Sequence, residues 1–388
     1  MRYITDNVLK NITFEEQFLI KLFNTKEFKR LGRINQLGLT NFLFPGATHT
    51  RLAHSLGAYQ LAKKFLNKFI IQDQVKIDEL TYKSTLAAAL LHDIGHGPFS
   101  HLFEKISNIN HEKYSLLIIN DKDSEINKVL NEENEKLVEN VSLILKGKYH
   151  LEWVNQLISS EIDVDRLDYL LRDSYHVGLD YGKIEYNWLI RNSKIIDNKL
   201  VFLQKAISTI EAMILGRYHM NKVVYNSAKN VACSILFIWF FNRLKFLFKQ
   251  NKLNYNYQKF IPLFLDQKLT VKQFIEFDDY DIFSYIKEAL NEKDPILNKI
   301  ANHLMYQKRA SIVDFNKITN ILEEEGFTWE KIDLKTSFYF YQESNHSKEA
   351  LILFNNNKIK KLRDVSTVVN LKITDYKNLE TEKIGLKI

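Results

Sequence analysis

The sequence contains little cysteine, proline or glycine: 1 Cys, 4 Pro and 12 Gly among 388 residues. The single cysteine, Cys233, excludes an intrachain disulfide framework, and this fits a reducing compartment. Residues 1–7 lack the features of a signal peptide, and the apolar run 231–241 is too short to span a bilayer before polar residues interrupt it. We therefore expect a cytoplasmic protein with no membrane segment.

The composition favours a large helical core. Hydrophobic residues make up 45% and aromatic residues 13% of the chain, which is long enough to bury an extensive interior. Amphipathic patterning with so few turn residues predicts a mainly α fold with a smaller C-terminal α+β appendage. We expect two regions, 1–250 and 251–388. The second should hold further helices, such as 271–277 and 312–325, and then short strands at 336–341 and 350–354 with a turn at 355–357.

Three histidines and an aspartate lie close together where an apolar helix is expected to end. Helix-forming residues 84–91 lead to His92 and Asp93, and glycines and a proline then stop the helix. One imidazole and one carboxylate do not complete the coordination shell of a divalent cation, so other segments must supply more nitrogen or oxygen ligands. Two segments offer them: 44–57, with His54 on an amphipathic helix, and the acidic stretch 161–173.

Several motifs carry a family resemblance. They are QLG (36–38), HTRLAHSLG (49–57), LLHDIGHGPFSH (90–101), HEKYS (111–115), EIDVDRLDYLLRD (161–173) and RYHMNKVVY (217–225). In this order they resemble the HD-domain deoxynucleoside triphosphate (dNTP) triphosphohydrolases of bacteria and animals, over about residues 20–230. The resemblance implies the helical HD phosphohydrolase fold and hydrolysis of a dNTP to deoxynucleoside and inorganic triphosphate.

The resemblance also implies a metal site and a catalytic group. The implied ligands of one divalent ion are His54, His92, Asp93 and Asp165. This ligand set suits Mn, Fe, Mg or Zn and does not choose among them. The implied catalytic residues are His96 and His111 at the α-phosphate and its attacking water, His101 as general acid to the departing 5′-oxygen, and Glu104, which stands where the family often has Asp.

A further set is implied to bind the substrate. It comprises Gln36 and Asp173 at the 3′-hydroxyl, Leu37 and Tyr225 against the sugar, Tyr169 in the sugar pocket, Arg51, Arg166 and Arg217 at the phosphates, and Asn226 near the base.

Helical spacing alone, without the resemblance, predicts only which side chains in these segments share a helix face, form a pair or cap a helix. Asp165, Tyr169 and Asp173 recur every four residues and so share one helix face. By the same spacing, Asp168 and Arg172 are expected to form an ion pair on the helix surface. His49 is expected to be structural. Asp163 is either a helix cap or part of the site.

The resemblance also implies partners. These are a dNTP substrate, a second copy of the chain in a dimer or tetramer, and a nucleotide activator. At Asn24 and Gly32 the chain departs from the residues with which the animal enzyme reads guanine in its activator site. A net charge of +7 is compatible with nucleic acid, but a solvated lysine-rich surface is the favoured explanation, as is a strand edge for the basic cluster 358–363.

Two other functions stay open. An HD-type phosphodiesterase or nuclease, acting on single-stranded nucleic acid or another nucleotide, would keep the metal. The lack of a second HD-type ligand set in the sequence weighs against a di-metal version of it. A nucleotide sensor without catalysis would predict the loss of a ligand, and all four matched ligand positions are kept.

Overall fold

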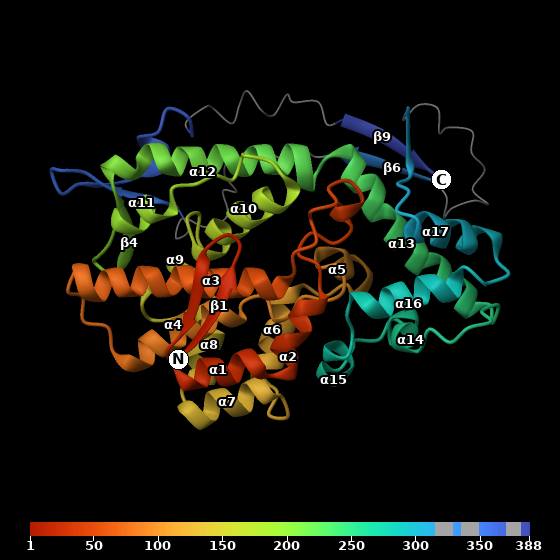
Figure 1. The fold of residues 1–388 in the computed structure, drawn as a ribbon, viewed down its shortest axis with the longest axis horizontal. Helices are drawn as coiled ribbons and strands as arrows, with labels where there is room; N and C mark the ends of the chain where they lie inside the picture. Colours follow the sequence, from red (N-terminus) through yellow and green to blue (C-terminus); the bar gives the residue numbers. More distant parts are fainter. Residues whose placement is uncertain (315–328, 335–348, 370–381) are drawn as a thin grey trace.

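Helices make up most of the structure, which is a computed structural model and describes residues 1–314, 329–334, 349–369 and 382–388 (Figure 1). The prediction of a mainly α fold is confirmed. The helices of the first part are α1 (Gln17–Asn24), α2 (Lys26–Arg30), α3 (Arg51–Asn67), α4 (Glu79–Leu91), α5 (His101–Ser107), α6 (His111–Asn120), α7 (Glu125–Glu133), α8 (Leu137–Leu145), α9 (Glu152–Ile158) and α10 (Val164–Val177). Those that follow are α11 (Tyr186–Arg191), α12 (Ile207–Met220), α13 (Ala228–Lys249), α14 (Ile261–Phe264), α15 (Val271–Ile275), α16 (Asp279–Ala289) and α17 (Pro295–Met305).

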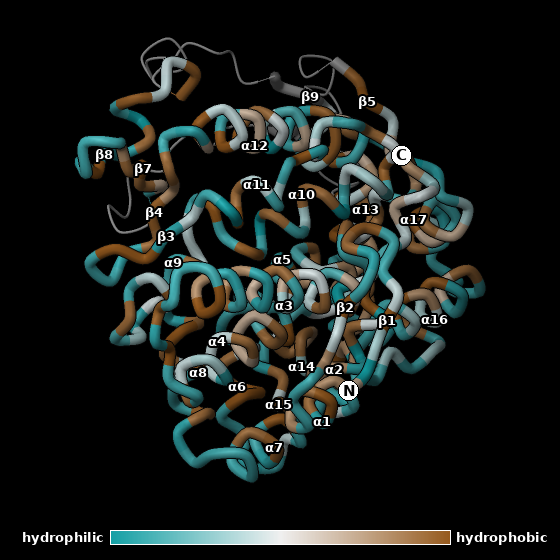
Figure 2. The backbone as a smooth tube through the Cα atoms, turned by 60° about the vertical axis from the view of Figure 1, so that its left-hand side comes forward, coloured by the Kyte–Doolittle hydropathy of each residue, from teal (hydrophilic) through white to brown (hydrophobic). Residues whose placement is uncertain are grey.

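Helix α3 is the centre of the helical body and packs against both α4 and α10. Its start is fixed by Thr50, whose side chain accepts a hydrogen bond from the backbone N–H of Ala53. Helix α10 begins in the same way at Asp163, so the cap interpretation of this residue is confirmed. Both α3 and α4 are buried on most sides, and Figure 2 shows brown, hydrophobic turns gathered toward the interior. Polar residues inside this body therefore need a specific partner or a function.

Helix α13 carries the apolar run that contains Cys233. By length and composition alone it could cross a membrane, but 56% of its most apolar window is buried within the protein. It packs against α5 and α17, and Cys233 is buried as a free thiol. These contacts agree with the expected buried core helix.

The strands form three small sheets. A hairpin joins β1 (Arg2–Asp6) to β2 (Lys10–Phe14), and β3 (Ser193–Ile196), β4 (Lys199–Leu203), β7 (Leu351–Leu353) and β8 (Ile359–Lys361) form a four-stranded sheet in the order β3-β4-β7-β8. Strand β7 runs parallel to β4, with Val201 opposite Leu351. The third sheet has the order β5-β9-β6, from β5 (Ser311–Asp314), β6 (Trp329–Leu334) and β9 (Glu382–Lys387).

Several C-terminal predictions can be compared with these strands. The strand at 350–354 and the turn at 355–357 are confirmed by β7 and the turn that follows it. The basic strand edge predicted at 358–363 is confirmed only for Ile359–Lys361, the edge strand β8, because Leu362 and Arg363 lie in a 3-10 helix. The helix predicted over 312–325 is wrong at its start, because β-branched Ile312 and Val313 lie in β5 and pair with β9. The rest of that helix and the strand predicted at 336–341 lie outside the described residues.

Candidate metal centre and active site

Three helices bring the predicted metal ligands together. His54 lies in the first turn of α3, His92 and Asp93 follow the last residue of α4, and Asp165 lies in the first turn of α10. The Nε2 atom of His54 is 3.1 Å from Nε2 of His92, 3.0 Å from Oδ1 of Asp165 and 3.5 Å from Oδ2 of Asp93. One ligand atom each from His54, His92 and Asp165 lies within 4.8 Å of the other two, as a metal site requires.

The hydrogen bonds behind the two imidazoles determine what they present to each other. Nδ1 of His54 donates to Asp168 Oδ2 at 2.8 Å, and Nδ1 of His92 donates to the carbonyl of Ala89 at 3.0 Å. When both imidazoles are neutral, each Nε2 atom therefore carries a lone pair. The two Nε2 atoms face each other and the carboxylates of Asp93 and Asp165. Such a convergence of electron-rich atoms favours a positive charge at its centre, whether a proton on His54 or a bound cation, and the donor set fits a divalent metal.

The pKa values of His54 and Asp93 are shifted because neighbouring charges outweigh the effect of burial. Burial lowers the pKa of His54, but the carboxylates of Asp165 and Asp168 outweigh it and raise the pKa to about 10. Burial raises the pKa of Asp93, while His92 and Arg51 lower it more, so the net shift is well below the usual value. The site therefore favours carboxylates in the charged form and a positive charge between the imidazoles.

Asp168 and Arg172 are not the surface ion pair that their spacing suggested; that prediction is wrong. Both side chains are fully buried, and Arg172 Nε donates to Asp168 Oδ2 at 2.8 Å. Arg172 also donates to Asp6 Oδ2 at 2.7 Å, which links α10 to the N-terminal hairpin. Gly57 makes room for the pair, because a Cβ atom there would lie 1.8 Å from Asp168 Oδ1. The i, i+4 spacing correctly predicted that the two side chains pair, but spacing alone does not tell whether that helix face is buried or exposed.

A second histidine group adjoins the first. Nδ1 atoms of His101 and His111 lie 2.9 and 2.7 Å from Glu104 Oε1, and the rings of His96 and His111 stack with centroids 3.9 Å apart. His96 Nε2 is 3.4 Å from Asp93 Oδ1, so Asp93 joins the two groups. These four residues, His96, His101, Glu104 and His111, could themselves hold an ion. The sequence motifs did not predict this second set of possible ligands.

The three arginines predicted at the phosphates differ in their surroundings. Arg51 is buried, and its Nε, Nη1 and Nη2 donate to Ser100 Oγ at 2.9 Å, Asp93 Oδ2 at 2.5 Å and Gln36 O at 3.3 Å. Arg166 is partly exposed and pairs with its own helix cap, Asp163, through Nη1. Arg217 lies in the last turn of α12, and its charge acts on Tyr169.

The predicted sugar-binding residues meet on the other side of His54. Tyr225 donates to Asp173 Oδ2 at 2.7 Å, and His49 Nε2 lies 2.7 Å from Asp173 Oδ1. The ring of Tyr169 contacts the rings of both His54 and Tyr225 edge-on, with centroids 6.5 Å apart in each case. Tyr225 ends a π-helical segment, Asn221–Tyr225, that continues α12, and such wide turns often occur at functional sites.

Gln36, Leu37 and Asn226 complete the predicted set. Gln36 is buried in the loop that follows Asn35, and Leu37 packs partly buried against the core. The backbone N–H of Asn226 ends the π-helical segment by donating to Asn221 O. Buried atoms without a hydrogen-bond partner among the described residues include Gln36 Oε1, His96 Nδ1 and His49 Nδ1, all in this region. Unpaired buried polar atoms are rare and indicate a place for a ligand or water.

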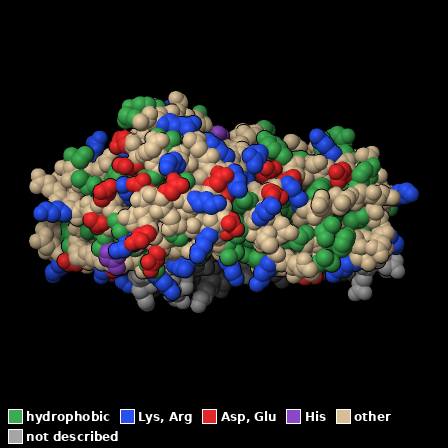
Figure 3. Space-filling model, turned by 90° about the horizontal axis from the view of Figure 1, so that it is seen from below, with side chains coloured by type: hydrophobic (Ala, Val, Ile, Leu, Met, Phe, Trp, Pro, Cys, Tyr) green, Lys and Arg blue, Asp and Glu red, His purple; other side chains and the backbone are tan. Residues whose placement is uncertain are grey.

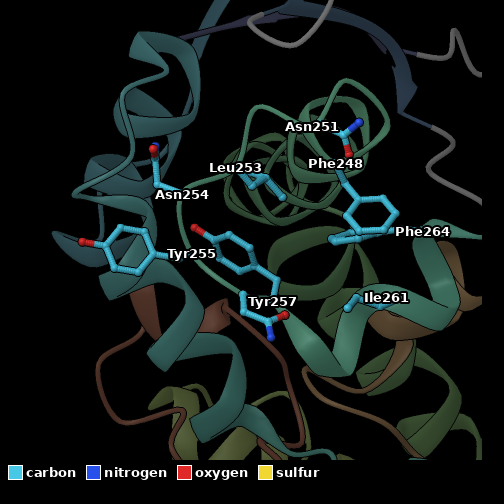
Figure 4. A pocket seen from close by; sticks show the side chains of 9 residues that line it. Phe248, Asn251, Leu253, Asn254, Tyr255, Tyr257, Ile261 and Phe264 are labelled. Atoms are coloured by element: carbon cyan, nitrogen blue, oxygen red, sulfur yellow. The ribbon is translucent and has the colours of Figure 1, made fainter.

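A separate cavity of about 340 Å³ lies beyond the end of α13 and shares no residue with the predicted site (Figure 4). It is lined by Phe248, Asn251, Leu253, Asn254, Tyr255, Asn256, Tyr257, Ile261 and Phe264. Amides and aromatic rings of this kind offer neither the carboxylates nor the imidazoles that hydrolysis needs. On the face of the molecule shown in Figure 3, basic and acidic side chains are interspersed, which agrees with a solvated surface as the origin of the net charge.

Residues that the sequence analysis did not assign to the site are Asp168, which orients His54, His49, which orients Asp173, and Ser100, which bonds Arg51. His49 and Ser100 lie inside the recognised motifs, so the motif could have indicated them. The available signal for Asp168 was Gly57, a glycine in the middle of a predicted helix, which marks a close approach.

Comparison with known proteins agrees with this geometry. Residues 51–173 match the HD domain family. The chain is 30% identical over 380 residues to the uncharacterized protein YwfO of Bacillus subtilis, covering 94% of this chain and 87% of that protein. It is 32% identical over 222 residues to the deoxynucleoside triphosphate triphosphohydrolase SAMHD1 homolog of Dictyostelium discoideum, covering 54% of this chain and 43% of that one.

Among solved structures, that of a phosphohydrolase from Bacteroides thetaiotaomicron matches with a TM-score of 0.85 and 26% identity, covering 100% of this chain and 99% of the other. The shared fold extends over the helices that carry the histidine groups and over the C-terminal region. With its HD motif, its cluster of metal-binding side chains and these relatives, the chain belongs to the HD-domain phosphohydrolase family.

Proposed function

We propose that this protein hydrolyses dNTPs to deoxynucleoside and inorganic triphosphate. The observation that carries the proposal is the convergence of His54, His92, Asp93 and Asp165 beside the His96, His101, Glu104 and His111 group, with Asp93 common to both. One group suits a divalent ion and the other suits proton transfer to a leaving group. The name of the Dictyostelium relative supports the choice of substrate.

Each part of the site has a proposed task. His54, His92 and Asp165, joined by Asp93 at 3.5 Å from His54, would hold the divalent ion, which when bound supplies Lewis acidity at the phosphorus to be attacked. Arg51 lies against Asp93, and Arg166 and Arg217 extend the positive charge toward α10 and α12. Among the histidines of the second group, His101 is the most exposed, at 66% of its side chain, and so can deliver a proton to the departing 5′-oxygen.

Selection of the sugar would come from the group around Asp173. Its carboxylate is held by His49 and Tyr225, which fixes its direction for a 3′-hydroxyl. Gln36 adds a buried amide oxygen that has no partner among the described residues. Leu37 and Tyr225 would exclude a 2′-hydroxyl by contact with the sugar, and the proposal therefore predicts a preference for dNTPs over NTPs.

Chromatography of the products tests the reaction directly. Each of the four dNTPs is supplied alone and in mixtures, with Mn²⁺ or Mg²⁺, and the proposal expects deoxynucleoside and intact triphosphate. Asp165→Ala should abolish turnover without unfolding the protein, because its side chain is 36% exposed and a ligand is lost. Asp180→Asn, an exposed acid beyond the end of α10, is the matched control. Release of pyrophosphate or orthophosphate, or full activity of Asp165→Ala, would contradict the proposal.

A second candidate is a phosphodiesterase that uses two metal ions. The observation in its favour is that His96, His101, Glu104 and His111 could hold an ion of their own. Against it, Glu104 Oε1 already accepts from both His101 and His111, an arrangement that needs no ion. Cleavage of single-stranded nucleic acid or a cyclic nucleotide, with two metal equivalents bound per chain, would favour this candidate over the first.

We propose a cytoplasmic homo-oligomer, a dimer or tetramer, that responds to a nucleotide activator. Because Asn24 and Gly32 replace the guanine-reading residues, the activator need not be a guanine nucleotide. Size-exclusion chromatography with and without each dNTP tests the oligomeric state and the activator. A nucleotide that activates by assembling the chains should shift the oligomer equilibrium.

A further inference from the structure

The first turn of α16 touches the active-site loops, although it belongs to the C-terminal region, which carries no recognised motif. In Figure 1 α16 lies next to α5, the helix that begins at His101. Its first residue, Asp279, is 3% exposed. The proposed chemistry does not use this buried acid, and burying a carboxylate is unfavourable unless its oxygens are hydrogen-bonded.

Both oxygens of Asp279 accept hydrogen bonds, and the donors lie in two different loops. Oδ2 accepts from the backbone N–H of Asn35 at 2.8 Å, and Oδ1 accepts from the backbone N–H of Phe99 at 2.7 Å. Asn35 immediately precedes Gln36, a predicted sugar contact. Phe99 lies between His96 and His101, two of the predicted catalytic residues.

The loop at Phe99 is one that needs such support. Phe99 and Ser100 have φ angles of 54° and 57°, in the left-handed region that residues with a Cβ atom rarely adopt. The hydroxyl of Ser100 donates to Asn35 O at 2.6 Å and accepts from Arg51 Nε at 2.9 Å. The strained residues are therefore tied to the loop of Gln36 by Asp279 and to α3 by Arg51.

Neighbouring charges strengthen the same junction. Buried Arg30 donates through Nη2 to the carbonyls of Ile94 and His96, at 2.9 and 2.8 Å, and through Nη1 to Phe277 O at 3.1 Å. Arg33 pairs with Asp278 at 2.5 Å. Burial raises the pKa of Asp279 to about 7 in spite of the two backbone donors, which shows how costly this placement of an acid is.

We propose that Asp279 is a positioning residue of the active site: its carboxylate holds the backbones of Phe99 and Asn35 together, and so places His96 and His101 relative to Gln36. The catalytic importance of His96, His101 and Gln36 rests on the proposed function, whereas the hydrogen bonds from Asn35 and Phe99 to Asp279 do not depend on it. A carboxylate is required because two N–H groups converge on it from opposite loops, whereas an asparagine would turn one NH₂ group toward a donor.

Asp279→Asn tests the proposal, with Asp281→Asn as the matched control. Asp281 belongs to the same helix turn; its carboxylate accepts from Asp278 N and pairs with Lys259 Nζ at 2.6 Å, so these partners stabilise α16 and lie outside the loops of Asn35 and Phe99. Hydrogen exchange should become faster at the Asn35 and Phe99 amides in Asp279→Asn and stay unchanged there in Asp281→Asn. With dNTP as substrate, kcat should fall by about 10–100-fold in Asp279→Asn alone, because His96 and His101 are displaced, at unchanged metal content.

Each outcome decides a separate point. Unchanged exchange at both amides in Asp279→Asn would overturn the proposal, as would an equal loss of kcat in Asp281→Asn, which would indicate a general effect of α16 stability. If the wild-type protein hydrolyses no dNTP, the proposed function fails while the exchange data still decide whether Asp279 holds the loops. Should Asp279→Asn not fold, Asp279→Glu keeps the charge with a longer reach, and it should show the same two amides exchanging faster in an otherwise protected protein.

Discussion

The two histidine groups of the site differ in how the protein holds them. In the first, His54 is fully buried and His92 is only 12% exposed, and each donates its Nδ1 proton to a fixed acceptor, Asp168 or the carbonyl of Ala89. In the second, His101 is largely exposed and shares a single acceptor, Glu104, with His111. A fixed tautomer with an inward lone pair suits a bound cation, whereas shared and exposed imidazoles suit the movement of protons. Variants in the two groups should therefore fail in different ways.

The largest effect is expected for His54→Ala, which should lose both bound metal and activity, down to the background rate. His54 is the ligand that lies nearest to all the others, and its removal leaves the two carboxylates without the imidazole between them. Metal content by mass spectrometry and dNTP turnover measure the two losses in one preparation. Full metal occupancy in this variant would show that the ion binds elsewhere and would break the distinction between the groups.

His101→Ala should lower kcat by about 10²–10⁴-fold, the usual range for a general acid, with no change in metal content. The exposed side chain contributes little to packing, and its hydrogen bond to Glu104 is solvent-screened, so the thermal midpoint should fall only slightly. His150→Ala, an exposed histidine that belongs to none of the recognised motifs, is the control for loss of any surface imidazole. Loss of metal from His101→Ala would instead mean that the second group holds an ion, in support of the two-metal candidate.

The sequence could predict the ligands but not their supports. His54, His92, Asp93 and Asp165 follow from motifs, because metal chemistry restricts which residue types can stand at these positions. Asp168 and Arg172 could not be placed in the same way, since a spacing of four fits a surface pair and a buried one equally well. Asp279 lies where no motif exists, and its role depends on a tertiary contact between residues 180 apart along the chain. Strand β5 was missed because its pairing partner, β9, comes about seventy residues later.

Asp168→Asn should weaken metal binding by about 10–100-fold, the usual range for a residue that orients a ligand. The carboxylate Oδ2 accepts from both His54 Nδ1 and Arg172 Nε, and an amide cannot accept both bonds and the third from Arg172 Nη2. Asp6→Asn is the matched control, because it weakens the same arginine from the far side without touching His54. Isothermal titration calorimetry with the metal ion should show a lower affinity in Asp168→Asn than in Asp6→Asn. Equal affinities would mean that Asp168 only stabilises the fold.

The smallest effect concerns stability in acid. Burial raises the pKa of Glu104, but hydrogen bonds from His101 and His111 lower it more, to about 2 from an ordinary value of 4.5. A pKa that is lower in the folded than in the unfolded state stabilises the protein above pH 4.5, and this contribution is lost as the pH falls toward 2. With His101 mostly exposed, the contribution should be about 1 kcal/mol.

Urea unfolding of the wild type and Glu104→Gln between pH 6.5 and pH 3.5 measures this contribution. The wild type should be the more stable at pH 6.5, and the difference between the two unfolding free energies should shrink toward pH 3.5, because the variant has no charge to lose. Glu112→Gln, an exposed acid in the first turn of α6, is the control. A difference that stays constant with pH would arise from packing of the Glu104 side chain, and the second group would then differ from the first, in which the carboxylates of Asp165 and Asp168 hold His54.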